Sequence, residues 1–432
     1  MRPSRGVLGF AAVALLLVLI PTAGAALGPG DTATGSGALA NENGGNFNTA
    51  DGVLALGSNT TGFYNTAVGA DALLQNTGGV QNTAAGAGAL QLNTTGFDDT
   101  ATGYNALETN TLGDGNTADG TSALFENTTG AANVAVGVDA LHANTTGERN
   151  VAAGTSALFS NTTGAFNTAL GEQALSNSTT ANANTAVGGL ALRDNTTGDS
   201  NAAFGGGSLK FNTIGFDNTA TGRSALETNT LGDGNTADGK SALFENTTGA
   251  ANVAVGVDAL NANTTGTSNV AAGTAGLYSN TTGAFNTALG QGAGQTITDA
   301  NANTTGSFNT FLGSLAGPGT PTQLTNATAI GANAVVNESN AIVLGGSGAF
   351  QANVGIGTTK PQSTVQIGTP TTSYGSYLQL PTVTTASPPP ATDCNTSSFA
   401  GRLVLQYDAQ KARTTLWSCS ASGVWTRLAQ GG

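Results

Sequence analysis

Residues 82–98 read NTAAGAGALQLNTTGFD, and this string carries the pattern that decides the fold. The pattern N-T-A-x-G-x-x-A-L-x-x-N-T-T-G-x-x recurs along the chain, and its first glycine returns every seventeen residues without a slip. Sixteen such glycines mark the repeat from Gly35 to Gly290. A fixed period of this length predicts a solenoid, in which each repeat forms one coil and buries its apolar side against its neighbours.

Two slots of the repeat identify the core. Alanine stands two residues before the first glycine in all sixteen repeats, and leucine stands four residues after it in fifteen of them. One slot is always a small residue and the other is almost always a large one. This pattern predicts a tight interior with leucine as its main side chain. The expected core residues and corner glycines include Ala67, Gly69, Leu73, Ala101, Gly103, Leu107, Ala135, Gly137 and Leu141.

Each coil is predicted to contain two short strands and two turns. Glycine and asparagine recur too often for a helix of ordinary length, and disordered low-complexity sequence has no need of such strict slots. Coils stacked at about 4.8 Å place asparagine over asparagine and threonine over threonine, so hydrogen-bonded side-chain ladders are expected. The fold class is therefore all-β, a parallel β-solenoid.

The slot just before the first glycine predicts a partner-facing surface. It is apolar in ten repeats and polar in six, which is not the pattern of a sealed core. An apolar stripe on an exposed surface is typical of an interaction site. We expect a subunit interface that includes Val68, Val136, Leu170, Val187, Phe204, Val255 and Leu289.

A block of seven whole repeats is duplicated. Residues 97–171 match residues 216–290 at 65 of 75 positions. After Gly290 a six-residue insertion shifts the next glycine of the series to Gly313, and a final repeat of fourteen residues separates Gly331 from Gly345.

The last coils contain NATAIG at residues 326–331 and NAIVLG at residues 340–345. This fourteen-residue unit resembles the YadA-like head repeat (Hep/Hag type) of trimeric autotransporter adhesins, and the seventeen-residue units look like its longer variant. The resemblance covers residues 31–346. It implies a left-handed β-roll in each chain, three chains packed side by side, and attachment to host molecules or other cells. No heptads and no barrel-like strands resembling that family's stalk and membrane anchor follow.

The N-terminus predicts export. Arg2 and Arg5 precede an apolar run from Val7 to Ile20, and a small-residue site follows at residues 23–25. This is the pattern of a secretory signal peptide at residues 1–25, and the run is too short for a membrane span. Without that segment the chain has ten basic and twenty-five acidic residues, a formal charge of −15. Nucleic acid and anionic membranes are therefore poor partners, and a secreted or cell-surface location is expected.

The C-terminal part has a different composition. We expect the solenoid to occupy residues 26–346, a linker with a proline-rich spacer residues 347–393, and a small β module residues 394–432. Strand-like pieces are expected at residues 402–407 and within residues 414–428. Cys394 and Cys419 are the two cysteines, and in an oxidising compartment a disulfide is favoured over a metal-binding pair.

The sequence predicts binding and not catalysis. Its one histidine, His142, becomes Asn261 in the duplicated block, and no nucleophile, base and orienting group stand in a shared pattern. No metal or other cofactor is expected, and the Asp- and Gly-rich runs at residues 113–119 and 232–238 are interpreted as surface turns. The expected function is an adhesin-like fibre that binds an extracellular protein or glycan. An ice- or surface-binding solenoid and a phage-tail-like fibre component are the alternatives.

Overall fold

The computed structural model describes residues 27–296, 298–356, 365–367, 382–383, 403–408, 413–420, 422 and 424–431. The predicted signal peptide at residues 1–25 lies outside these ranges. The chain divides into two compact units, Met1–Gln351 and Ala352–Gly432.

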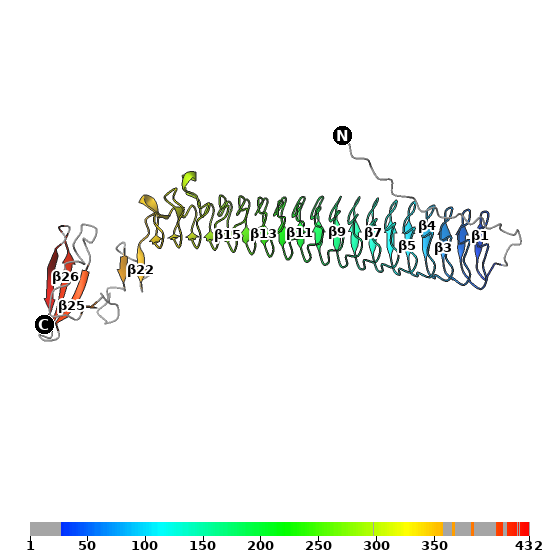
Figure 1. Ribbon diagram of the computed structural model, residues 1–432, viewed down its shortest axis with the longest axis horizontal. Helices are drawn as coiled ribbons and strands as arrows, with labels where there is room; N and C mark the ends of the chain where they lie inside the picture. The colour runs from blue at the N-terminus through cyan, green and yellow to red at the C-terminus, as the bar shows by residue number, and fades with distance from the viewer. Residues whose placement is uncertain are drawn as a thin grey trace, which may run out of the picture. The chain divides into compact units, whose positions relative to one another are not determined.

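The first unit is a parallel β-solenoid with one three-residue strand in each coil (Figure 1). Nineteen strands form one sheet, and successive strands pair in parallel along the stack. From β1 to β16 the strands are β1 (Thr32–Thr34), β2 (Thr49–Asp51), β3 (Thr66–Val68), β4 (Thr83–Ala85), β5 (Thr100–Thr102), β6 (Thr117–Asp119), β7 (Val134–Val136), β8 (Val151–Ala153), β9 (Thr168–Leu170), β10 (Thr185–Val187), β11 (Ala202–Phe204), β12 (Thr219–Thr221), β13 (Thr236–Asp238), β14 (Val253–Val255), β15 (Val270–Ala272) and β16 (Thr287–Leu289). The sheet ends with β17 (Thr310–Leu312), β19 (Thr328–Ile330) and β21 (Ile342–Leu344).

The coil beginning at β3 shows how the repeat folds. Side chains alternate across a strand, so Ala67 points into the core with no exposed surface while Val68 points outward. Gly69 then turns the corner at a φ of 133°, a conformation that residues with a β-carbon rarely adopt. Leu73 follows and is fully buried beside the strand. The alanine and leucine slots that the sequence predicts as core therefore lie in the core.

In the seventeen-residue coils from β1 to β16 the second expected strand does not form, and for these coils the prediction was wrong. Asp71 and Leu73 both have left-handed backbones, with φ of 61° and 50°. The segment still bonds to the next coil, because Leu73 N donates to Ala89 O at 3.0 Å. A left-handed residue costs about 1–2 kcal/mol, and burying a leucine contributes about 1.5–3 kcal/mol. Burial therefore offsets the backbone strain.

A second alanine, next to the leucine, completes the apolar core, as Ala72 does beside Leu73. The polar interior of the coils is made of two asparagine ladders. The first ladder uses the asparagine of N-T-A: Asn65 N donates to Asn48 Oδ1 at 3.0 Å, and Asn48 Nδ2 donates to Gly62 O at 2.9 Å. The second ladder uses the asparagine of N-T-T-G: Asn76 Nδ2 donates to Asn59 Oδ1 at 2.7 Å. These side chains are fully buried, so the ladders satisfy amides whose desolvation would otherwise be costly.

The coils after β16 depart from the repeat as the sequence predicts. β17 pairs with β16 at an offset of 23 residues, and β21 pairs with β19 at an offset of fourteen. The inserted residues loop out at a short 3-10 helix, η1 (Asp299–Asn301). A second one, η2 (Gly348–Phe350), lies after β21, and a two-stranded sheet of β18 (Gly317–Pro318) and β20 (Val335–Val336) forms beside the main sheet.

The core changes its main side chain in these last coils. Gly294 and Gly317 occupy the leucine slot of their coils, and Phe311 occupies the alanine slot of β17. Phe311 is fully buried and is among the largest buried side chains of the described residues. A large residue on the strand side thus replaces the volume lost on the leucine side, as close packing requires.

The second unit contains two small sheets. β22 (Val354–Ile356) pairs in parallel with β23 (Val365–Ile367). The other sheet runs β24 (Thr382–Val383), β25 (Leu403–Asp408), β26 (Arg413–Cys419) and β27 (Trp425–Gly431). The three C-terminal strands match the predicted pieces closely. β24 was not predicted, because it is a two-residue strand inside the expected spacer.

The predicted disulfide stays a prediction. Cys419 is buried at the end of β26, and Cys394 lies outside the described residues. In the same sheet, Trp417 Nε1 donates to Gln406 Oε1 at 2.8 Å, so one indole contributes to the packing of the module.

Candidate binding face

The outward side of the nineteen-stranded sheet forms a regular surface along the stack. Each strand turns its first and third side chains outward and its middle side chain into the core. Since every pair is in register, outward residues line up in two ranks along the stack. We call this surface the sheet face, and its ranks the first rank and the third rank.

The first rank is built almost entirely of small β-branched residues. Thirteen of its nineteen positions are threonine, contributed by the N-T-A part of the repeat. The six others are Val134, Val151, Ala202, Val253, Val270 and Ile342. β-branched residues suit a strand surface because their restricted side chains pack against their neighbours. The result is a line of hydroxyl and methyl groups with no charge.

The third rank contains all seven residues predicted as a subunit interface. They are exposed to solvent at 37–44% of their surface except Val187, which is half-buried, and they are Val68, Val136, Leu170, Val187, Phe204, Val255 and Leu289. The rank continues through Leu312, Ile330 and Leu344. Sequence reasoning missed these last three because the period changes after Gly290, although each still stands just before a glycine.

The sheet face is nearly free of charge. Its two ranks include three ionisable residues, Asp51, Asp119 and Asp238, and no lysine or arginine. Between Asp119 and Asp238 the third rank is apolar in five successive coils, from Val136 to Phe204. An exposed apolar stripe of this length, regular and uncharged, is typical of a surface that another molecule covers.

His142 lies on a different side of the coil and belongs to an aromatic stack. Its ring lies between those of Phe125 and Phe159, with centroids 5.1 and 5.0 Å away. Asp114 in the first Asp- and Gly-rich run accepts a hydrogen bond from Phe97 N at 3.1 Å, and Asp233 accepts one from Phe216 N at 3.0 Å. These two aspartates thus bond to backbone in turns. The interpretation of both runs as turns was wrong for their last three residues, which form β6 and β13.

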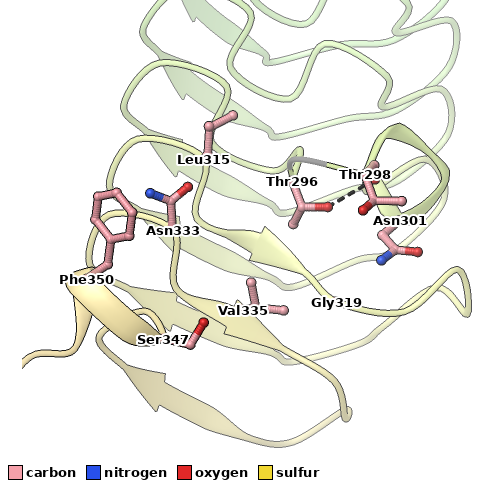
Figure 2. Close-up of a pocket in the computed structure, with 9 residues that line it drawn as sticks. All are labelled: Thr296, Thr298, Asn301, Leu315, Gly319, Asn333, Val335, Ser347 and Phe350. Atoms are coloured by element: carbon pink, nitrogen blue, oxygen red, sulfur yellow. Dashed lines mark hydrogen bonds between the residues drawn. The ribbon is translucent and has the colours of Figure 1, made fainter.

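A separate pocket of about 350 Å³ lies where the repeat changes. Figure 2 shows Phe350 at one end of it and Thr298 with Asn301 at the other. Its lining has no charged residue and consists of Thr296, Thr298, Asn301, Leu315, Gly319, Asn333, Val335, Ser347 and Phe350. The combination of apolar side chains with hydroxyls and amides suits a neutral ligand.

Across the described parts of the chain, no helix is long and apolar enough to cross a membrane, and no three histidine, cysteine or acidic side chains gather as a metal site would require. Comparison of the chain with family models, with curated proteins and with solved structures finds no match.

Proposed function

We propose that this protein is a secreted or cell-surface fibre of the adhesin type, whose sheet face mediates assembly and binding. The observation that supports the proposal best is the third rank, whose apolar residues a monomer would leave in water over many coils. A repeated surface binds by many weak and equivalent contacts, so its affinity comes from multivalency and not from one pocket. The −15 charge of the mature chain favours a protein or glycan partner over nucleic acid.

Three copies of the chain would assemble through the third rank. Apolar residues at the same height on each copy would meet, and each would lose the exposed surface that it has in a single chain. The resemblance of the last coils to trimeric adhesin heads supports three copies, and the third rank supplies the surface. No stalk or anchor enters this proposal.

Charged substitutions on the third rank are expected to dissociate the assembly. Replacing Val136, Leu170 and Val187 together by aspartate would bring like charges into an apolar contact, where desolvation is costly. The expected result is a mass equal to one chain at concentrations where the unchanged protein is a trimer, measured by sedimentation velocity.

A matched control carries the same three charges elsewhere. Tyr104, Phe166 and Phe216 are exposed apolar residues outside the two ranks, and their replacement by aspartate should leave the mass unchanged. If the third-rank variant keeps the mass of the unchanged protein, the sheet face is not the assembly surface. Binding of both variants to matrix proteins and glycan arrays then shows whether attachment needs the assembled form.

The first rank supports a second candidate, binding to ice or another ordered surface. Adjacent threonines in N-T-T-G do not form one face, but the threonine of N-T-A faces outward in thirteen coils at a constant register. A line of threonines with strand spacing could match a lattice. Thermal hysteresis and ice recrystallisation assays test this, with replacement of Thr66, Thr83, Thr100 and Thr117 by lysine expected to abolish the effect. No activity in the unchanged protein would exclude this candidate.

A further inference from the structure

Two positions of the first asparagine ladder hold an acid: Asp31 in the first coil, which is half-buried, and Asp99 inside the stack. Asp99 occupies the asparagine slot, and its side chain is fully buried. The same slot in the second copy of the duplicated block, 119 residues later, holds Asn218, which is also fully buried. The chain therefore contains the same interior site twice, once with a carboxyl group and once with an amide.

The amide version shows what the slot requires. Asn218 Nδ2 donates to Gly232 O at 2.8 Å, and the same carbonyl accepts Asn229 Nδ2 at 2.9 Å. Asn82 Nδ2 likewise donates to Gly96 O at 2.8 Å. In these coils each amide rung thus directs a donor at a glycine carbonyl fourteen residues further along the chain.

The acid version lacks that donor. Asp99 Oδ1 accepts Asn116 N at 2.8 Å, as any rung does. Its Oδ2, which takes the place of the amide nitrogen, accepts Asn110 Nδ2 at 3.0 Å instead of donating to Gly113 O. If Asp99 has no proton, the Gly113 carbonyl accepts a hydrogen bond from Asn110 only. Its counterpart in the second copy, the Gly232 carbonyl, accepts from both Asn218 and Asn229.

The missing donor also affects the second ladder. Asn110 Nδ2 has two hydrogens but serves Asp99 Oδ2, Gly113 O and Asn93 Oδ1. Its bond to Asn93 is 3.3 Å long, whereas the equivalent bond from Asn229 to Asn212 is 2.8 Å.

We propose that Asp99 is a proton-controlled rung: with a proton on Oδ2 it donates to Gly113 O as an amide does, and its ionisation loosens the stack in the first copy of the duplicated block only.

The electrostatic surroundings favour the protonated form. Burial raises the pKa of Asp99 from 3.8 to about 7, while hydrogen bonds from Asn116 oppose the rise. The charged groups that act on it are Asp114 and Asp98, and both raise its pKa further. Because the folded pKa is above the unfolded one, the folded chain holds this proton between about pH 4 and 7 and the unfolded chain does not. Stability is therefore highest below this window and falls as pH rises through it.

Hydrogen exchange of the full mature chain tests the proposal. After correction for intrinsic exchange rates, amides of the coils around Asp99 should lose protection between pH 4 and 8, by up to about a thousand-fold for three pKa units. The equivalent amides around Asn218 should change much less. In the D99N variant the first block should behave like the second, and N218D should transfer the pH dependence to the second block.

A spectroscopic measurement makes the result independent of folding differences between variants. The infrared carbonyl band of protonated carboxylic acids should be weaker in D99N at pH 5.5 than in the unchanged protein, by the contribution of one carboxyl group. Burial also raises the pKa of Glu42 and Glu108, and these two groups contribute equally in both proteins. If that band is the same in both, or if D99N keeps the pH dependence of the first block, Asp99 is ionised in the folded chain and the proposal is overturned.

Discussion

Replacing Gly103 by alanine is expected to lower the free energy of unfolding by about 2–6 kcal/mol, although it adds a single methyl group. Gly103 has a φ of 129°, and an added β-carbon would lie 2.6 Å from Gly120 O and 2.7 Å from Gly120 C. Those are backbone atoms of the next coil, so relief requires the coils to separate. Backbone strain of this kind costs about 1–3 kcal/mol, and overpacking costs about as much again. Thermal denaturation followed by circular dichroism measures the loss.

Gly115 provides the matched control. It also has a positive φ, 65°, but an added β-carbon there meets no atom within 4 Å. Gly115→Ala should therefore cost only the left-handed penalty of about 1–2 kcal/mol. Equal shifts in melting temperature for the two variants would mean that contact between coils at Gly103 is not what demands glycine.

Replacing Asn144 by leucine is expected to cost about 4 kcal/mol or more. Its Nδ2 donates to Asn127 Oδ1 at 2.7 Å and to Gly147 O at 3.0 Å, and its Oδ1 accepts Asn161 Nδ2 at 2.8 Å. Leucine has a similar volume but can neither donate nor accept a hydrogen bond. The three partner atoms would therefore stay buried and lose the bond that Asn144 makes to each of them. Each such group costs about 1–3 kcal/mol. Urea denaturation of the chain without residues 1–25 provides the measurement.

Thr145 is the control for Asn144, because it also bonds along the stack but near the surface. Its Oγ1 donates to Thr162 O at 2.9 Å from a partly buried position. Water can replace that bond, so Thr145→Val should cost about 1 kcal/mol or less. If the Asn144 variant loses no more than this, the buried ladder is not a main source of stability.

An interruption of the second ladder leaves buried polar atoms without hydrogen-bond partners. Ser178 stands in an asparagine slot of the second ladder and is too short to reach its neighbour. Its Oγ and Asn161 Oδ1 are both buried without a hydrogen-bond partner. Asn161 is thus the point at which the second ladder lacks a donor from the following coil.

The strictest slots of the repeat predict the fold well, because they are where packing leaves no freedom. Alanine fills the slot of Ala67 in all sixteen repeats and leucine fills the slot of Leu73 in fifteen, and both residues are fully buried. The stacking of asparagines follows from the period alone. The break after Gly290 and the fourteen-residue offset at the end were also visible as changes of spacing.

Other features depend on tertiary context that a single repeat does not display. Leucine is a poor candidate for a left-handed backbone, so the pattern around Leu73 favours a strand until its burial is known. Phe311 departs from the alanine slot, and the glycines in the leucine slots explain this departure. For the candidate site, the apolar slot before the glycine predicts the third rank, but the threonine rank beside it requires knowledge of which strand side faces outward.

Asp99 illustrates the limit most clearly. In the sequence it is one of ten differences between the two copies of the block. Its meaning comes from its burial and from the carbonyl that the slot must satisfy, and neither is visible from the repeat pattern.

The central claim is that the sheet face holds copies of this chain together as a fibre. The solution mass of the chain without residues 1–25, measured by size-exclusion chromatography with light scattering, tests it most directly. The expected mass is three times that of one chain. A mass of one chain across micromolar concentrations would contradict it, and would show that the third rank remains in water.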